Sequence, residues 1–270
     1  MLSEPQRSSF EELVEVMARL RAEGGCPWDR EQTHASLKPY LVEEAYEALE
    51  AIDREDDAEL CRELGDVLLQ VVFHAQIASE EGRFTVEEVG RAIVGKLIRR
   101  HPHVFGETQV EGAEEVLTNW ERIKQAERQE EDKPDSVLEG VPRQLPALLR
   151  AQRIQHKAAR VGFDWPSLDG PLDKVEEELG ELRQACQSGT PEELEEEFGD
   201  LLFALVNTSR FLKIDAEDAL RRAVDKFERR FRLVEAAFRA QGRQLQESTL
   251  EEMDRVWDQV KAGEKEEERG

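Results

Sequence analysis

The chain contains one acidic helical pattern twice, and this duplication limits the folds open to it more than any other feature. "EEAYEALEA" (43–51) aligns with "EELGELRQA" (177–185), and "ELGDVLLQVV" (63–72) returns as "EFGDLLFALV" (197–206). Both matches are 134 residues apart, so no insertion separates the two acidic stretches in either copy. A long internal repeat of this kind is typical of a duplicated structural unit. We therefore expect two copies of one module.

Further matches extend the duplication at slightly different offsets. "KLIRR" (96–100) matches "KFERR" (226–230), and "WERIK" from Trp120 matches "WDQVK" from Trp257. The changing offset indicates loops of different length between matching helices. Between the copies, "EEDKPDSVLEGVPRQLP" breaks the helical pattern with charge, proline and glycine. We place the domain boundary there, with an N-terminal module over 1–132 and a C-terminal module over 133–270.

The spacing of apolar residues predicts an all-α fold of tandem duplicated helical modules. Charged residues make up 36% of the chain and aromatic residues only 6%, a mixture that suits amphipathic helices. We expect four or five helices in each copy, including one over 37–52 and one over 58–80. Thr85 and Glu88 predict a capping box for a helix that reaches Arg100. Thr190 and Pro191 predict a helix start in the second copy.

Overall charge and cysteine usage exclude several classes of protein. The net charge of −24 argues against general binding to nucleic acid or to anionic membranes, which needs clustered Lys and Arg. Cys26, Cys61 and Cys186 are odd in number and lack CxxC spacing, so we expect reduced thiols. The first residues lack the pattern of a signal peptide, and the apolar runs are too short to span a bilayer. We expect a cytoplasmic protein.

Paired acids on consecutive helices predict a metal site. Glu44 and Glu47 are three residues apart and share a helix face, as do Glu63 and Asp66 on the following helix. A short turn makes the two helices an antiparallel hairpin, across which the two pairs face each other. Four converging carboxylates repel one another unless a cation lies among them, and oxygen-only ligands suit Mg²⁺ or Mn²⁺. The second copy supplies the same four ligands at Glu178, Glu181, Glu197 and Asp200.

A simpler alternative is that these acids form solvated helix faces. The chain has 61 acidic residues, so a single ExxE pattern carries little information. The repetition of pair plus pair at fixed separation favours a site. Gly65 and Gly199 add to this, because glycine inside a helix costs about 1 kcal/mol relative to alanine and needs a packing reason.

Recurring basic and aromatic residues suggest an anionic ligand. Lys96, Arg99 and Arg100 form a KxxRR pattern that returns in the second copy, and such residues bind phosphate oxygens well. Ordinary surface charge is the alternative. Trp120 and Trp257 are read first as core residues, with base stacking as the second reading. "HPH" at 101–103 is read as a local turn. Neither a P-loop nor an HExxH motif is present.

Several motifs together resemble the MazG proteins, which are nucleoside triphosphate pyrophosphohydrolases. They are "GGCPWDREQTHASLKPYLVEEAYEALEAI", "ELGDVLLQVVFHAQIA", "RRHPHVFG", "KAARVGFDW" and "KFERRF". The resemblance covers nearly the whole chain. It extends more distantly to all-α dUTPases and to phosphoribosyl-ATP pyrophosphohydrolase, which share the EExxE…ExxD pattern.

The resemblance implies Mg²⁺-dependent hydrolysis of NTPs and dNTPs to monophosphate and pyrophosphate. It also implies a homodimer in which helices of paired modules form four-helix-bundle-like domains. Metal would bind Glu178, Glu181, Glu197 and Asp200, and nucleotide would contact Lys174, Glu193, Leu194, Glu195, Glu196, Asp200, Lys226, Phe227, Glu228, Arg229, Arg230 and Trp257. The catalytic residues would be Glu178, Glu197 and Lys226.

The two copies are not expected to be equivalent. The first copy keeps the acids Glu44, Glu47, Glu63 and Asp66, but Lys174 has no clear counterpart there. We therefore expect the second copy to carry most of the turnover, by in-line attack of water that releases pyrophosphate. A nucleotide-binding regulatory protein without turnover is the alternative, and a purely structural helical dimer is a third reading.

Overall fold

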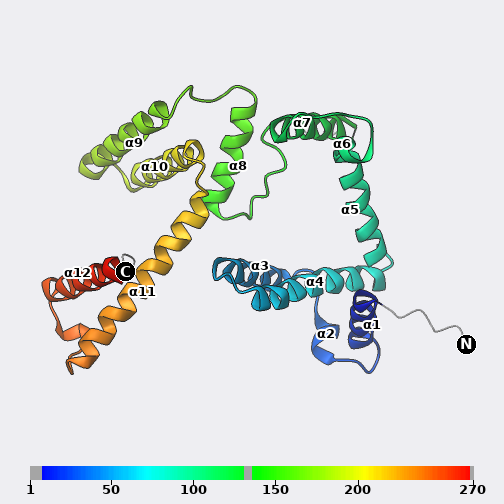
Figure 1. Cartoon of the computed structure of the whole chain (residues 1–270), viewed down its shortest axis with the longest axis horizontal. Helices are drawn as coiled ribbons and strands as arrows, with labels where there is room; N and C mark the ends of the chain where they lie inside the picture. The colour runs from blue at the N-terminus through cyan, green and yellow to red at the C-terminus, as the bar shows by residue number, and fades with distance from the viewer. Residues whose placement is uncertain (1–7, 131–135, 268–270) are drawn as a thin grey trace, which may run out of the picture. The chain divides into compact units, whose positions relative to one another are not determined.

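The structure is a computed structural model that describes residues 8–130 and 136–267, and these ranges contain helices and no strand (Figure 1). The all-α prediction is confirmed. The chain divides into two compact units, Met1–Glu127 and Arg128–Gly270, and each is described by itself. The domain limits 1–132 and 133–270 stay a prediction.

The helices follow the duplicated pattern of the sequence. The first unit contains α1 (Ser9–Arg21), α2 (Pro27–Glu31), α3 (Lys38–Asp53), α4 (Asp57–Glu80), α5 (Val86–Arg100), α6 (Pro102–Phe105) and α7 (Ala113–Glu130). The second contains α8 (Ala147–Arg160), α9 (Asp169–Ser188), α10 (Pro191–Phe211), α11 (Ala216–Ala240), the 3₁₀ turn η1 (Leu245–Glu247) and α12 (Leu250–Glu267). The expected helices over 37–52 and 58–80 correspond to α3 and α4.

Local signals in the sequence fix where the principal helices begin. Thr85 and Glu88 form the expected capping box of α5, with the backbone N–H of Thr85 donating to the Glu88 carboxylate at 2.8 Å. Thr190 caps α10 in the same way, and Pro191 occupies the first helical turn. Each cap satisfies backbone N–H groups that have no partner inside the helix. Both predicted helix starts are confirmed.

The two copies differ where the basic pattern ends. In the first unit α5 stops at Arg100, and Pro102 begins the short helix α6 after His101. The local turn expected at "HPH" is therefore corrected to a helix start, because proline cannot continue α5 but fits a first helical turn. In the second unit no proline intervenes, and α11 continues to Ala240.

The core of the first unit lies where α1 packs against α4. Met17, Leu37, Val72, Phe73 and Ile77 form one buried apolar cluster there. Complete burial of such side chains stabilises a fold by about 1.5–3 kcal/mol each. This core holds the α4 end of the α3–α4 hairpin in place.

The core of the second unit forms where α10 packs against α8 and α9, and α8 against α11. Val206, Val234 and Phe238 are almost completely buried. Buried polar side chains tie the helices together: the Gln152 amide donates to the Ile214 carbonyl at 2.9 Å, and the Thr208 hydroxyl hydrogen-bonds the Ala204 carbonyl at 3.1 Å. These contacts hold α10 in place beside α9.

Large apolar side chains nevertheless remain exposed along one face of each hairpin. Leu64, Leu68 and Val71 form such a stripe on α4, and Phe198, Leu202 and Leu205 form the matching stripe on α10. Spacings of four and three residues place each trio on one helix face. We call these the α4 stripe and the α10 stripe.

The mid-helix glycines also lack the packing reason expected of them within the chain. A Cβ built on Gly65 or Gly199 would meet no atom within 4 Å. Their neighbours within the described units therefore do not explain them, and the expectation is corrected to that extent.

Two further expectations concern the cysteines and the membrane. Cys26, Cys61 and Cys186 are all free. Across residues 8–130 and 136–267, each helix is too short or too polar to cross a lipid bilayer.

Candidate active site

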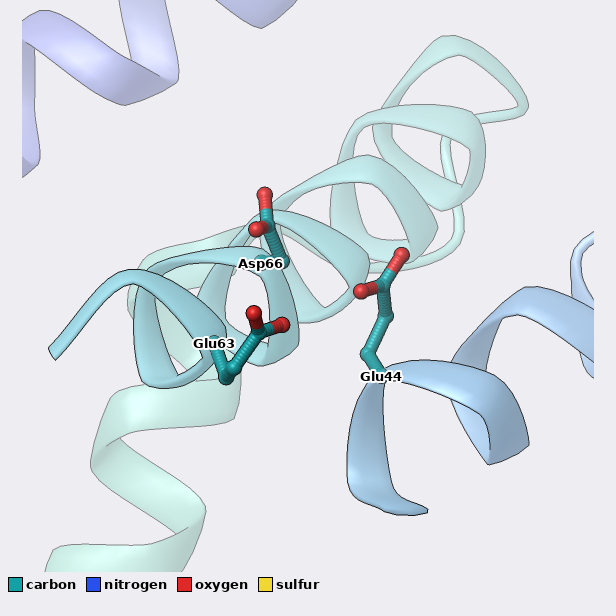
Figure 2. A group of neighbouring side chains, drawn as sticks. All are labelled: Glu44, Glu63 and Asp66. Carbon is teal, nitrogen blue, oxygen red and sulfur yellow. The ribbon is translucent and has the colours of Figure 1, made fainter. Parts of the chain in front are cut away.

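The first acidic cluster forms across the α3–α4 hairpin. Only three residues join the two helices, and Asp56 caps α4 by accepting from the Glu59 backbone N–H at 3.0 Å. Glu44 on α3 and Glu63 and Asp66 on α4 bring carboxylate oxygens within 4.8 Å of one another (Figure 2). The predicted convergence of acids from both helices is therefore present in the structure.

Mutual repulsion is visible in the protonation of this cluster. Burial raises the pKa of Glu44, and the negative charges of Asp66 and Glu47 raise it further. Burial also raises the pKa of Glu63, followed by the charges of Glu47 and Asp66. Glu47 lies outside the closest trio but near enough to act on both pKa values. All four predicted ligands thus belong to one electrostatic group.

The second acidic cluster forms across the α9–α10 hairpin at the matching positions. Carboxylate oxygens of Glu178, Glu181 and Glu197 lie within 4.8 Å of one another. Glu178 is only 4% exposed, which is rare for a carboxylate without a compensating charge. Partial burial raises the pKa of Glu197, and the charges of Glu181, Glu178 and Asp200 raise it further. Asp200 therefore joins the group electrostatically although it lies outside the closest trio.

Lys174 supplies the compensating charge in the second cluster. Its ammonium group lies 2.6 Å from the Glu178 carboxylate and 2.9 Å from that of Glu177. These contacts raise the pKa of Lys174. The residue 134 positions earlier is Tyr40, which packs edge-on against Trp28 at a ring distance of 5.8 Å. The first cluster instead has an amide neighbour, because Gln70 donates to Glu44 at 3.5 Å.

The donor chemistry of both clusters fits a hard divalent cation. Each closest trio offers carboxylate oxygens alone, without histidine or cysteine. Mg²⁺ and Ca²⁺ prefer such ligands, whereas structural zinc sites use sulfur and imidazole. A cation among the acids would also relieve the repulsion that raises the pKa values of Glu44, Glu63 and Glu197.

The residues expected to contact nucleotide are divided between two helices. Glu193 to Glu196 form the first turns of α10, where Glu193 completes the capping box by accepting from the Thr190 backbone N–H at 2.7 Å. Lys226 to Arg230 lie on α11. Leu194 is half-buried, while Glu195, Glu196, Lys226, Phe227, Glu228 and Arg229 are exposed. The structure brings Lys174 to the acidic cluster, and no contact joins the α11 residues to it within the described part of the chain.

The arginines of the KxxRR pattern are held by a glutamate in both units. Arg230 lies 2.7 Å from Glu264 on α12, and Arg229 lies 3.2 Å from the same carboxylate. In the first unit Arg99 and Arg100 both lie 2.6 Å from Glu127 on α7. These arginine contacts lower the pKa of Glu264, and they lower that of Glu127 to about 2.

Sequence reasoning missed this pair of ion-pair clamps, although a signal was present. Glu127 and Glu264 are 137 residues apart, which is also the separation of Trp120 and Trp257. The same offset therefore marks the whole α7–α12 match.

The two tryptophans lie against their own units. Trp257 packs on Phe227 with ring centres 5.3 Å apart, and Trp120 meets His101 edge-on at 4.9 Å. These contacts agree with the reading of both as packing residues. His101 and His103 belong to neither acidic trio.

These features define the class of protein: an all-α chain with a duplicated helical hairpin that gathers carboxylates for a divalent metal. Residues 32–105 and 171–234 match the family model described as the MazG nucleotide pyrophosphohydrolase domain. The chain belongs to the MazG family. Both matched segments contain one acidic hairpin and the helix that follows it.

Named relatives span nearly the same length. The chain is 52% identical over 254 residues to the "Nucleoside triphosphate pyrophosphohydrolase/pyrophosphatase MazG" of Thermotoga maritima, covering 94% of this chain and 96% of that protein. It is 51% identical over 257 residues to the "Nucleoside triphosphate pyrophosphohydrolase" of Escherichia coli K12, covering 94% and 97%. A protein of the same name from Mycolicibacterium smegmatis is 34% identical over 245 residues, covering 89% and 64%.

Proposed function

We propose that the chain hydrolyses nucleoside triphosphates to nucleoside monophosphate and pyrophosphate. One observation carries the proposal: three carboxylates of the α9–α10 hairpin converge beside a lysine in a chain of the MazG family. Carboxylates to hold a metal, beside a cation to hold phosphate, are the parts that phosphoryl chemistry requires. The printed names of the relatives support the same reaction.

Mg²⁺, with Mn²⁺ as a substitute, is the cation that we propose for both clusters. Its ligands would be Glu178, Glu181, Glu197 and Asp200 in the second unit and Glu44, Glu47, Glu63 and Asp66 in the first. A bound divalent ion neutralises phosphate charge and makes a coordinated water a better nucleophile.

The chain's own side chains would do the remaining work. Lys174 now contacts Glu178 and would exchange this contact for phosphate oxygens. Glu178 and Glu197 border the place where water must be oriented, and either is suited to accept its proton. Lys226 would stabilise the charge on departing pyrophosphate. In-line attack on the α-phosphorus then releases pyrophosphate and leaves the monophosphate.

Other proposed nucleotide contacts lie around this centre. They are Glu193, Leu194, Glu195, Glu196, Asp200, Phe227, Glu228, Arg229, Arg230 and Trp257. The clamp by Glu264 keeps the two arginine side chains in defined positions on α11. Arginines fixed in this way lose less conformational freedom when they bind phosphate.

We further propose that the chain acts as a homodimer. Each hairpin carries an uncovered apolar stripe, and a glycine without neighbours lies next to one end of it. Exposed apolar surface of this extent marks an interaction site. A second copy would cover the stripes and complete four-helix bundles. The three free cysteines agree with a reducing, cytoplasmic location, which stays a prediction.

A direct assay tests the proposed reaction. The full chain is incubated with mixed NTPs and Mg²⁺ or Mn²⁺, and pyrophosphate is measured. Glu197→Gln should abolish its release, whereas Glu87→Gln, which alters an exposed surface pair with Arg91, should not. Absence of pyrophosphate with either metal would refute the hydrolase, and nucleotide binding without turnover would then support a regulatory protein.

A further inference from the structure

A second feature of the C-terminal unit is a cavity of about 510 Å³ between α8, α10 and the loop that leads into α9. Its walls include Trp165 and Phe163 from the loop and Phe203 from α10. Trp165 is 45% exposed and Phe163 is 82% exposed. Flat, accessible aromatic surfaces of this kind suit a planar ring.

Polar groups are placed among these aromatic walls. Gln155 lines the cavity and is 7% exposed; its amide nitrogen donates to the Phe203 carbonyl at 2.8 Å. Its amide oxygen is buried and has no hydrogen-bond partner among the described residues. Asn207 accepts from Arg210 through its side-chain oxygen at 3.2 Å and 3.0 Å, which leaves its amide nitrogen to donate. The cavity therefore offers an acceptor and a donor for the edge of a heterocycle.

The cavity is held open by contacts on its rim. Arg210 binds Asp164 through both guanidinium nitrogens, one of them at 2.9 Å. Trp165 lies against the start of α9, where a Cβ on Gly170 would come within 2.5 Å of the indole ring. Only glycine at position 170 allows this close approach. The indole is thereby fixed at the mouth of the cavity rather than inside it.

The cavity and the acidic cluster lie along the same two helices. Asp164 and Trp165 immediately precede α9, and Lys174 lies between them and Glu178 along the chain. On α10 the six residues from Glu197 to Phe203 correspond to about 9 Å of helix. A triphosphate at the carboxylates and at Lys174 therefore leaves its nucleoside within reach of the cavity.

We propose that this cavity binds the nucleobase of the nucleoside triphosphate, with the ring stacked on Trp165 and its polar edge read by Gln155 and Asn207. This assignment rests on the proposed function, since it takes the phosphates to lie at the acidic cluster. It gives base stacking to Trp165 and leaves Trp257 in its packing against Phe227.

Nucleoside binding without metal isolates this contact from catalysis. The full chain is titrated with adenosine, cytidine, guanosine and uridine while tryptophan fluorescence is followed. Trp165→Ala should weaken binding of the nucleosides about tenfold or more, the usual effect of removing a stacking aromatic. Trp28→Ala is the matched control, because Trp28 is also half-exposed but lies in the first unit. Gln155→Met removes the polar edge at nearly constant side-chain volume and should weaken binding too.

The outcomes separate this inference from the proposed reaction. Nucleoside quenching that persists in Glu197→Gln, while pyrophosphate release is lost, supports both. Nucleoside binding in a chain that never releases pyrophosphate keeps the cavity assignment and refutes the hydrolase. Loss of binding in Trp257→Ala but not in Trp165→Ala would overturn the assignment. So would a hydrolytically active chain that binds no nucleoside, or a Gln155→Met variant that is more stable and binds nucleosides unchanged.

Discussion

At the scale of residues, the two acidic clusters differ mainly in one neighbour. Glu178 is buried beside the ammonium group of Lys174, whereas Glu44 has Gln70 and an aromatic pair formed by Tyr40 and Trp28. An ammonium group can bind phosphate, but a phenol offers a single weaker donor. The second cluster is therefore better equipped to hold a triphosphate, although both can gather a metal.

Substitution of matching acids tests this ranking. Glu197→Gln should lower the kcat of pyrophosphate release by about 100-fold or more, because it removes a carboxylate from the reacting centre. Glu63→Gln should cause a smaller loss. Both rates are measured on the full chain with saturating Mg²⁺, and equal losses would contradict the ranking.

Lys174 can be tested separately from the metal ligands. Lys174→Gln should raise the KM for NTP by about tenfold or more, since a charged hydrogen bond to phosphate is lost. Mn²⁺ binding, followed by electron paramagnetic resonance, should persist. Lys261→Gln is the matched control, because Lys261 also contacts an acid three residues away but lies on α12. An unchanged KM would remove Lys174 from the site.

At the scale of elements, the same clamp closes each unit. Two adjacent arginines of α5 bind Glu127 of α7, and two adjacent arginines of α11 bind Glu264 of α12. Glu127 and Glu264 are largely shielded, each with a side chain 17% exposed, so these pairs are less screened than ordinary surface pairs. The clamp joins the basic helix to the last helix of each copy.

The clamp in the first unit predicts a dependence of stability on pH. The pKa of Glu127 is lowered from 4.5 to about 2, so its contribution is complete above pH 4.5. As the pH falls from 4.5 towards 2, the unfolded state takes up the proton first and the free energy of unfolding decreases. Glu127→Gln should lower the Tm at pH 7 and reduce its loss on acidification. Glu87→Gln, in an exposed pair, should leave the Tm almost unchanged, and an equal effect of both would contradict the clamp.

At the scale of the whole molecule, each unit leaves part of its apolar surface uncovered. The α4 stripe and the α10 stripe lie at positions 134 residues apart, so the duplication preserved an exposed apolar face. Gly65 and Gly199, each next to the first residue of its stripe, have no neighbour for a Cβ. A single chain gains nothing from these features, but a second copy packed on them would.

Mass measurement in solution tests the homodimer. The chain should have twice its 31.0 kDa mass in light scattering after gel filtration. Leu202→Glu should shift the equilibrium towards monomer, because it places a charge in the apolar contact. Leu250→Glu changes another exposed leucine outside the stripes and should leave the mass unchanged. A monomeric wild-type chain at micromolar concentration would refute the dimer.

The sequence by itself determined the helices, their caps and the pairing of the acids. Thr85 with Glu88 and Thr190 with Glu193 predicted helix starts because capping depends on residues within one turn of each other. Spacing of three residues likewise put Glu63 and Asp66 on one face before any tertiary contact was known. These features depend on neighbours in the sequence, so the sequence alone contains them.

Only the tertiary structure decided what lies beside each acid and each arginine. The clamp on Arg230 by Glu264, and the cavity between Gln155, Trp165 and Phe203, join residues more than 30 positions apart. Such contacts depend on how helices pack, which no local pattern specifies. Lys174 combines both cases: the helix repeat places it one turn from Glu178, whereas the burial of Glu178 against α10 makes their contact matter.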